Sequence, residues 1–83
     1  MELVVTSKSG EYFKFKTKHG SIVEILGFEF KINEEKAAQL YAIIYEDKTF
    51  YISTLKTEEE HRGKGLMTKL INKAIEVAKA RNC

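Results

Sequence analysis

A short basic loop rich in glycine runs directly into the clearest helical stretch of the chain. Glycine and cationic residues alternate in this loop, which reads Arg62-Gly63-Lys64-Gly65. Apolar residues then recur at helical spacing over residues 66–81, so we expect an amphipathic helix there. Backbone N–H groups exposed by glycine and the positive end of a helix dipole together favour an anion. The pattern therefore predicts a phosphate-binding turn at the start of this helix.

The residues before the loop alternate between apolar and polar, as β-strands do. The strand over residues 39–46 is apolar on both faces, which favours a central position in a sheet. Residues 33–38 allow two interpretations, a short helix capped by Asn33 or a hairpin loop. Turns are expected at Ser9-Gly10, His19-Gly20 and Asp47-Lys48. We expect strands over residues 2–6, 12–18, 21–32, 39–46 and 49–55.

The apolar parity changes within the strand over residues 21–32. Val23 and Ile25 share one parity, with Glu24 opposite them, and the later phenylalanines share the other parity. One extra residue at the point of change would restore a single apolar face. We therefore predict a β-bulge at Gly27.

The length and composition of the chain limit its fold and its partners. Eighty-three residues suffice for one domain over residues 1–83. We predict an α+β fold, an antiparallel sheet of about five strands backed by one long C-terminal helix. A net charge of +2 argues against nucleic acid as a ligand, and no apolar run is long enough to span a membrane. The single Cys83 and the lack of a signal-peptide pattern favour a cytoplasmic setting.

Residues 39–82 resemble the central part of a GNAT acetyltransferase domain. The shared order is a central strand, a tight turn, a second strand, a loop and a long helix. The family pattern Arg/Gln-x-x-Gly-x-Gly/Ala reads Arg62-Gly63-Lys64-Gly65-Leu66-Met67 in this chain. Methionine at position 67 replaces the small residue that the family prefers. The resemblance divides the domain into N-terminal strands over residues 1–32 and a cofactor-binding core over residues 39–83.

This resemblance implies a site for acetyl-CoA. In the family, N–H groups of the loop hold the pyrophosphate, and cationic side chains add charge. The preceding strand bonds the pantetheine arm, here through Leu55 and Thr57, and one of its N–H groups polarises the acetyl carbonyl. The implied cofactor-binding residues are Leu55, Thr57, Arg62, Gly63, Lys64, Gly65, Leu66 and Met67.

The chain also departs from the family pattern. The family continues with a strand that completes the cofactor slot and with a tyrosine that often acts as general acid, and the sequence reaches neither. We expect a fragment, a half-size member, or a subunit whose partner supplies the wall. The open edge of the strand over residues 49–55 predicts a homodimer. No carboxylate lies in residues 52–55, so no catalytic base is nominated, and Glu58, Glu59 and Glu60 are expected to form a solvated acidic run.

Two functions follow from the resemblance. The first is an N-acetyltransferase that moves the acetyl group of acetyl-CoA to an amine of a protein or small molecule. The alternative is a non-catalytic module that binds CoA or a protein. His19 and His61 are expected at the surface, and with Cys83 they do not form a metal site. The tyrosines at positions 41, 45 and 51 are expected in the core or on a face of the sheet.

Overall fold

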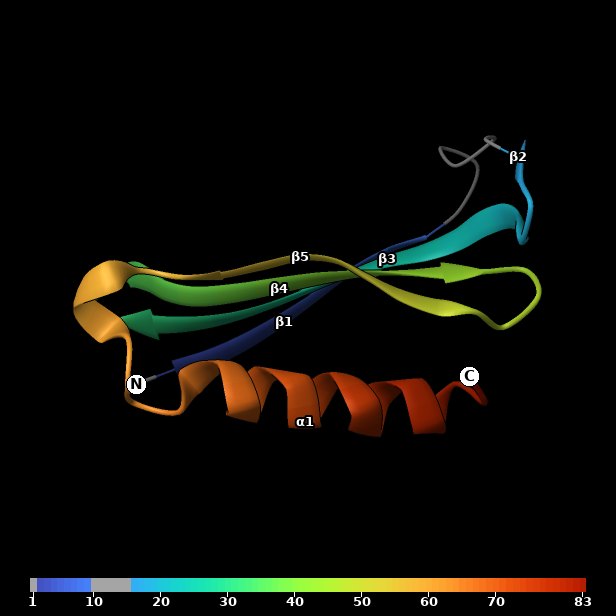
Figure 1. Ribbon diagram of the computed structural model, residues 1–83. Coiled ribbons are helices and arrows are strands. Elements are labelled where there is room, and N and C mark those ends of the chain that lie inside the picture. Colours follow the sequence, from blue (N-terminus) through green and yellow to red (C-terminus); the bar gives the residue numbers. More distant parts are fainter. Residues whose placement is uncertain (1, 10–15) are drawn as a thin grey trace.

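The computed structural model of the chain describes residues 2–9 and 16–83. An antiparallel sheet has the strand order β1-β3-β4-β5, and one helix lies along one of its faces (Figure 1). The short strand β2 pairs with β3 and lies outside this order. The predicted α+β fold with a long C-terminal helix is confirmed. The elements are β1 (Glu2–Ser9), β2 (Lys16–Thr17), β3 (Gly20–Ile32), β4 (Glu35–Tyr45), β5 (Phe50–Thr57), the 3₁₀ helix η1 (Glu59–His61) and α1 (Leu66–Ala80).

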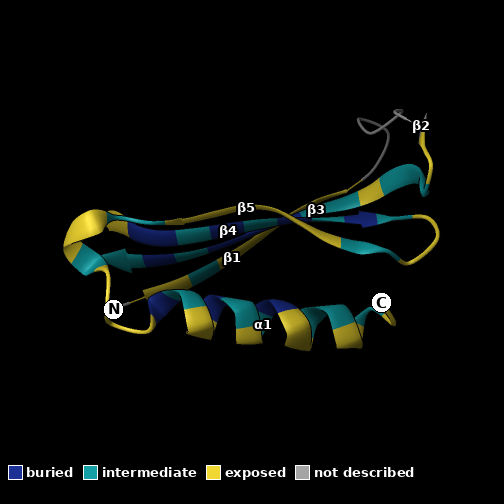
Figure 2. Ribbon diagram, viewed as in Figure 1, coloured by how far each residue is buried: buried dark blue, intermediate teal, exposed yellow. Residues whose placement is uncertain are grey.

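The core lies between α1 and the face of the sheet that it covers (Figure 2). Leu66, Leu70 and Ala74 recur every four residues along α1 and are buried, as the helical spacing predicts. Alternate residues of β3 and β4 meet them because side chains on one face of a strand recur every second residue. The sheet contributes Leu26, Phe28, Phe30, Ala37, Ala38, Leu40, Ala42 and Ile44 to this core.

Strand β4 is central, as its two apolar faces predict, since it pairs with β3 on one side and β5 on the other. Asn33 and Glu34 both have positive φ angles, 52° and 68°. Two consecutive residues of that kind form the tight turn that suits the twist of a hairpin. The hairpin interpretation of residues 33–38 is therefore correct, and β4 begins at Glu35 instead of following a helix.

The predicted bulge at Gly27 is wrong. Gly27 pairs regularly with Thr6 on β1 and Tyr41 on β4, and the β3–β4 register shifts at Val23 and between Phe30 and Lys31 instead. A Cβ atom at Gly27 would lie 2.7 Å from the Thr6 hydroxyl oxygen and 3.0 Å from a Tyr41 ring carbon. The glycine thus allows the Thr6 and Tyr41 side chains to pack close to the backbone of β3.

Other boundaries differ modestly from expectation. Strand β1 continues to Ser9, and β5 runs from Phe50 to Thr57, so the expected polar loop is replaced by a strand end and η1. Of the strand expected over residues 12–18, only its end is described, as β2. The remainder of that strand and Gly10 of the first expected turn lie outside the described residues.

Candidate functional site

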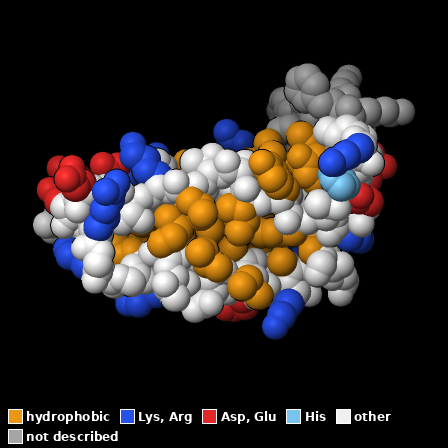
Figure 3. All heavy atoms as spheres, in the orientation of Figure 1, with side chains coloured by type: hydrophobic (Ala, Val, Ile, Leu, Met, Phe, Trp, Pro, Cys, Tyr) orange, Lys and Arg blue, Asp and Glu red, His pale blue; other side chains and the backbone are white. Residues whose placement is uncertain are grey.

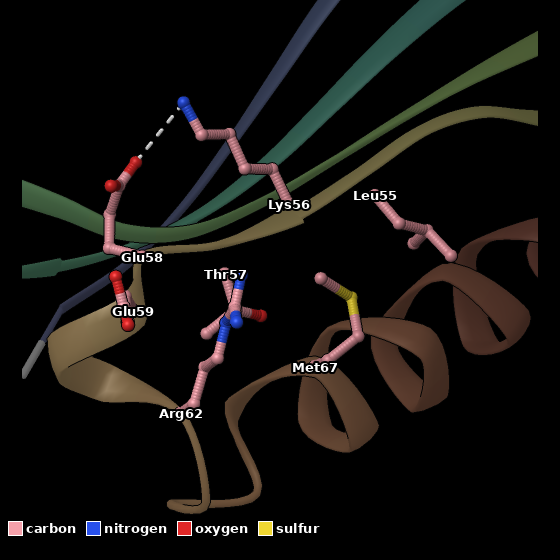
Figure 4. Close-up of a pocket in the computed structure, with 7 residues that line it drawn as sticks. All are labelled: Leu55, Lys56, Thr57, Glu58, Glu59, Arg62 and Met67. Carbon is pink, nitrogen blue, oxygen red and sulfur yellow. Dashed lines mark ion pairs between the residues drawn. The ribbon is translucent and has the colours of Figure 1, made fainter.

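The joint between the end of β5 and the start of α1 forms an open cavity of about 640 Å³. Figure 4 shows Met67 rising from the first turn of α1 and Arg62 rising from the loop toward the end of β5. A smaller hollow of about 210 Å³ continues the cavity over the loop, because Thr57, Arg62 and Met67 line both. The larger cavity is lined by Leu55, Lys56, Thr57, Glu58, Glu59, Arg62 and Met67.

The two glycines of the loop lie in backbone conformations that favour glycine. Gly63 and Gly65 have φ angles of 82° and 71°, in the left-handed region that other residues seldom adopt. A Cβ atom built on either glycine would meet nothing within 4 Å, so the backbone is open to a ligand there. Gly65 is the N-cap residue of α1, and the first turn holds no acidic side chain. The N–H groups and the dipole of this helix end are therefore free of a carboxylate from their own turn.

The predicted site residues between the end of β5 and the start of α1 differ in the direction and burial of their side chains. Leu55 and Thr57 face the helix, since they pair with the buried Leu40 and Ala38 of β4. Met67 is half-buried against the core and still lines both hollows, so its bulk does not fill the loop. The Leu66 side chain is buried, and only its backbone is available to a ligand.

The two cations of the loop are not equivalent. Arg62 lines both hollows. The Lys64 ammonium instead lies 3.1 Å from Nδ1 of His61. Because an ammonium only donates hydrogen bonds, this Nδ1 accepts and the imidazole is neutral in that arrangement. Arg62 is thus the cation that is best placed for an anion in the cavity.

Some lining residues were not among those predicted. His61 was expected at the surface, but only 14% of its side chain is exposed, and it lines the smaller hollow with Thr68. Glu59 and Glu60 are exposed, as expected of a solvated run, and the partly exposed Glu58 also lies at the cavity wall and pairs with Lys56 at 3.3 Å. Their position beside the loop motif was the signal that could have identified them.

Strand β5 carries a bulge of its own, at Ser53. Tyr41 pairs with Thr54 and Ala42 pairs with Ile52, so Ser53 is the extra residue. Its hydroxyl donates to the carbonyl of Tyr41 at 3.2 Å. Bulges at sheet edges redirect the neighbouring groups and are frequent beside binding sites. This one lies two residues from Leu55, on the strand that leads into the cavity.

The other chemistry that the structure offers is limited. Among residues 2–9 and 16–83, no group of three or more His, Cys, Asp or Glu side chains is arranged to hold a metal ion. In the same part of the chain, no helix has the length and apolar character needed to cross a membrane.

A family model described as the acetyltransferase (GNAT) family matches residues 6–83. The chain belongs to this family. The resemblance of residues 39–82 is therefore confirmed, and the match also includes most of the N-terminal strands. No match was found among curated proteins or among solved structures. Enzymes of the GNAT family typically use acetyl-CoA, and the loop, helix end and cavity described above fit a pyrophosphate and its attached arm.

Proposed function

We propose that this GNAT domain is an acetyl-CoA-dependent N-acetyltransferase. The observation that carries the proposal is the loop at the start of α1, where Gly63 and Gly65 hold left-handed backbone with open space above them. The hollow over this loop adjoins the cavity at the end of β5, since Thr57, Arg62 and Met67 line both. An elongated ligand with a phosphate part and an arm fits this shape.

Each part of the site has a proposed role in binding. The N–H groups of residues 63–67 would hold the pyrophosphate, with the Arg62 guanidinium beside it. The pantetheine arm would lie along β5, where Leu55 and Thr57 supply backbone hydrogen bonds. Strand β5 ends the strand order of the described sheet, so its outer edge has the free N–H and C=O groups that such an arm requires.

The reaction itself is a simple exchange. The nitrogen of a neutral amine attacks the carbonyl carbon of the thioester, and the new C–N bond replaces the C–S bond. Coenzyme A leaves as a thiolate and ends as a thiol with the proton that the nitrogen loses. Attack requires only that the amine be deprotonated, so this mechanism assigns no side chain as the base.

Binding of acetyl-CoA by calorimetry tests the proposal. We expect saturable binding by the intact chain and a loss of at least about tenfold in affinity for Gly65→Val, because a branched side chain would occupy the space where the phosphate approaches the backbone. Ala80→Val, at the other end of α1, introduces the same side chain away from the site and should leave the affinity unchanged. Absence of both heat and a thermal shift at millimolar acetyl-CoA would refute the proposal.

A non-catalytic CoA-binding or protein-interaction module is the second candidate. It is favoured by the lack of any carboxylate in β5, where many members of the family place a base. Release of free thiol in the presence of acetyl-CoA and a mixture of primary amines distinguishes the two candidates. Binding without any amine-dependent thiol would favour the module.

A further inference from the structure

A second cavity, of about 470 Å³, lies at the opposite end of β5 from the glycine loop. It is bounded by the turn that joins β2 to β3 and by the hairpin that joins β4 to β5 (Figure 1). Figure 3 shows hydrophobic side chains gathered at this end of the molecule as well as along β5 and α1. The cavity is lined by Thr17, Lys18, His19, Tyr45, Thr49 and Tyr51.

His19 is held in one orientation at the rim of this cavity. Its Nδ1 lies 2.8 Å from an Asp47 carboxylate oxygen and 3.3 Å from the Thr49 hydroxyl. Hydrogen bonds from Thr49, and then from His19, hold the pKa of Asp47 below its ordinary value. An ionised carboxylate only accepts hydrogen bonds, so Nδ1 carries the hydrogen. In the neutral ring, Nε2 then has a lone pair that can accept a hydrogen bond from a ligand.

Two tyrosines form the apolar part of the cavity. Tyr51 pairs with Ile43 of β4, and Tyr45 lies two residues beyond Ile43 on the same strand. Both tyrosine side chains therefore lie on the face of the sheet away from α1, as near-diagonal neighbours. The Tyr45 ring lies 5.5 Å from the His19 ring, at an angle of 49°. The Tyr51 side chain is 53% exposed, although it belongs to a large aromatic residue. Aromatic faces of this kind pack well against a flat ring.

The position of the cavity along β5 relates it to the acetyl group. Under the proposed function, the pantetheine arm starts near Thr57, and its extended chain is about as long as four residues of a strand. Its thioester would then lie beside the bulge at Ser53. Tyr51 is two residues beyond, at about 7 Å along the strand.

We propose that this second cavity holds the body of the acceptor, a primary amine joined by a short chain to a flat ring. In this assignment, which rests on the proposed function, Tyr45 and Tyr51 pack against the ring. A hydroxyl on the ring donates a hydrogen bond to Nε2 of His19. The amine extends along β5 toward the thioester.

Binding of tyramine in the absence of acetyl-CoA is the first test, because it does not depend on transfer. We expect titration with tyramine to shift the NMR signals of His19, Tyr45 and Tyr51 and to leave those of the glycine loop unchanged. Tyr51→Ala should weaken this binding about three- to tenfold, as expected for the loss of one aromatic contact. Val5→Ala, at an exposed site on β1, is the control and should have no effect.

Steady-state transfer to tyramine and to phenethylamine, which lacks the hydroxyl, is the second test. We expect tyramine to have the higher kcat/KM by about fivefold, the value of one hydrogen bond. The preference should disappear in His19→Ala, while the affinity for acetyl-CoA should stay unchanged. Tyr51→Ala should raise KM for both amines.

The possible failures are distinguishable. If the intact chain binds no acetyl-CoA, the proposed function is wrong, and the acceptor assignment is lost with it. If transfer to amines occurs and neither Tyr51→Ala nor His19→Ala changes KM or the tyramine preference, only the acceptor assignment is wrong. Tyramine shifts confined to the glycine loop would also overturn it.

Discussion

The position of Glu24 obscures the alternation of apolar residues along strand β3. Its carboxylate faces α1 and accepts hydrogen bonds from the Arg81 guanidinium at 2.6 and 3.0 Å and from the Ser7 hydroxyl. Glu24 therefore belongs to the same face as Leu26 and Phe28, and the apolar face is continuous without a bulge at Gly27. Alternation along the strand put Glu24 opposite Val23 and Ile25, and its partner Arg81 is 57 residues away. A pairing over such a distance leaves no trace in a local pattern.

The Glu24–Arg81 pair should make part of the stability dependent on pH. Partial burial raises the pKa of Glu24, but the hydrogen bonds from Arg81 and Ser7 outweigh it, so the pKa lies below the ordinary value of 4.5. A lowered pKa means that the stabilisation is present above pH 4.5 and disappears as the pH falls through the pKa of the folded state. We expect Arg81→Gln to lower the free energy of unfolding by about 1 kcal/mol at pH 7, discounted for the partial exposure of Arg81.

Chemical denaturation at several pH values measures this effect. The difference between the original chain and Arg81→Gln should shrink as the pH falls below 4.5 through the lowered pKa of Glu24. Lys73→Gln is the control, because Lys73 pairs with Glu76 on the exposed side of α1 and should contribute less than about 0.5 kcal/mol. A difference that stays constant from pH 7 to pH 3 would show that Arg81 acts by packing alone.

Among the site residues, backbone roles were easier to predict than side-chain roles. The left-handed conformations of Gly63 and Gly65 follow from residue type and from the strand–loop–helix order. The contact of Lys64 with His61 is local but has no pattern in the sequence, and the arrangement of the second cavity around His19 depends on tertiary contacts. Histidine in a turn has no periodic pattern, so the sequence could not show that Asp47 orients it.

At the scale of elements, strong periodicity predicted α1 and β4 well. Helix α1 begins at the expected Leu66 and ends one residue before Arg81, because its apolar stripe and the preceding glycine define it locally. The hairpin at residues 33–34 was harder to predict. Its two central residues, Asn33 and Glu34, include no glycine, and Asn33 is as typical of a helix cap as of a turn. The pairing of β4 with β3 decided between the two.

The packing of α1 against the sheet can be tested at Leu70. Its side chain is fully buried in the core, so Leu70→Ala removes apolar contacts and leaves a cavity. We expect a loss of about 2–5 kcal/mol in the free energy of unfolding, which in a domain of this size is enough to unfold a large fraction of molecules. Urea denaturation followed by circular dichroism measures it.

Ile75→Ala on the same helix is the matched control. Ile75 is 47% exposed, and the substitution should change stability by less than about 1 kcal/mol. A loss below about 0.5 kcal/mol for Leu70→Ala would mean that this face of α1 is not packed as described.

At the scale of the whole molecule, exposed apolar side chains of the described residues gather on the β5 side. Strand β5 ends the strand order, and its Tyr51, Ile52 and Leu55 side chains are 53%, 36% and 52% exposed. Ile75 of α1 adds to this surface, and Figure 3 shows hydrophobic side chains gathered between β5 and the helix. An edge strand with free backbone groups and exposed apolar side chains is a template for association. The same edge carries the proposed pantetheine site.

We therefore expect the chain to form a homodimer through β5. In an antiparallel pairing of two copies of β5, a register that places Ile52 of one copy opposite Leu55 of the other also places Tyr51 opposite Lys56. Apolar side chains then meet on the α1 face, and on the other face no two lysines are opposed. The partner strand and the pantetheine arm would use the same outer-edge N–H and C=O groups of β5, so they compete, and the affinity for acetyl-CoA should fall as the protein concentration rises.

Sedimentation velocity over a range of protein concentrations, with and without acetyl-CoA, distinguishes the homodimer from a monomer. Acetyl-CoA should decrease the dimer fraction, because a ligand that binds only the monomer must favour it. Ile52→Lys introduces a charge at the centre of the edge and should give a monomer that still binds acetyl-CoA. Leu3→Lys, on the opposite edge strand β1, is the matched control and should stay dimeric. A chain that is monomeric at about 100 micromolar in the absence of acetyl-CoA would show that the β5 edge needs no partner.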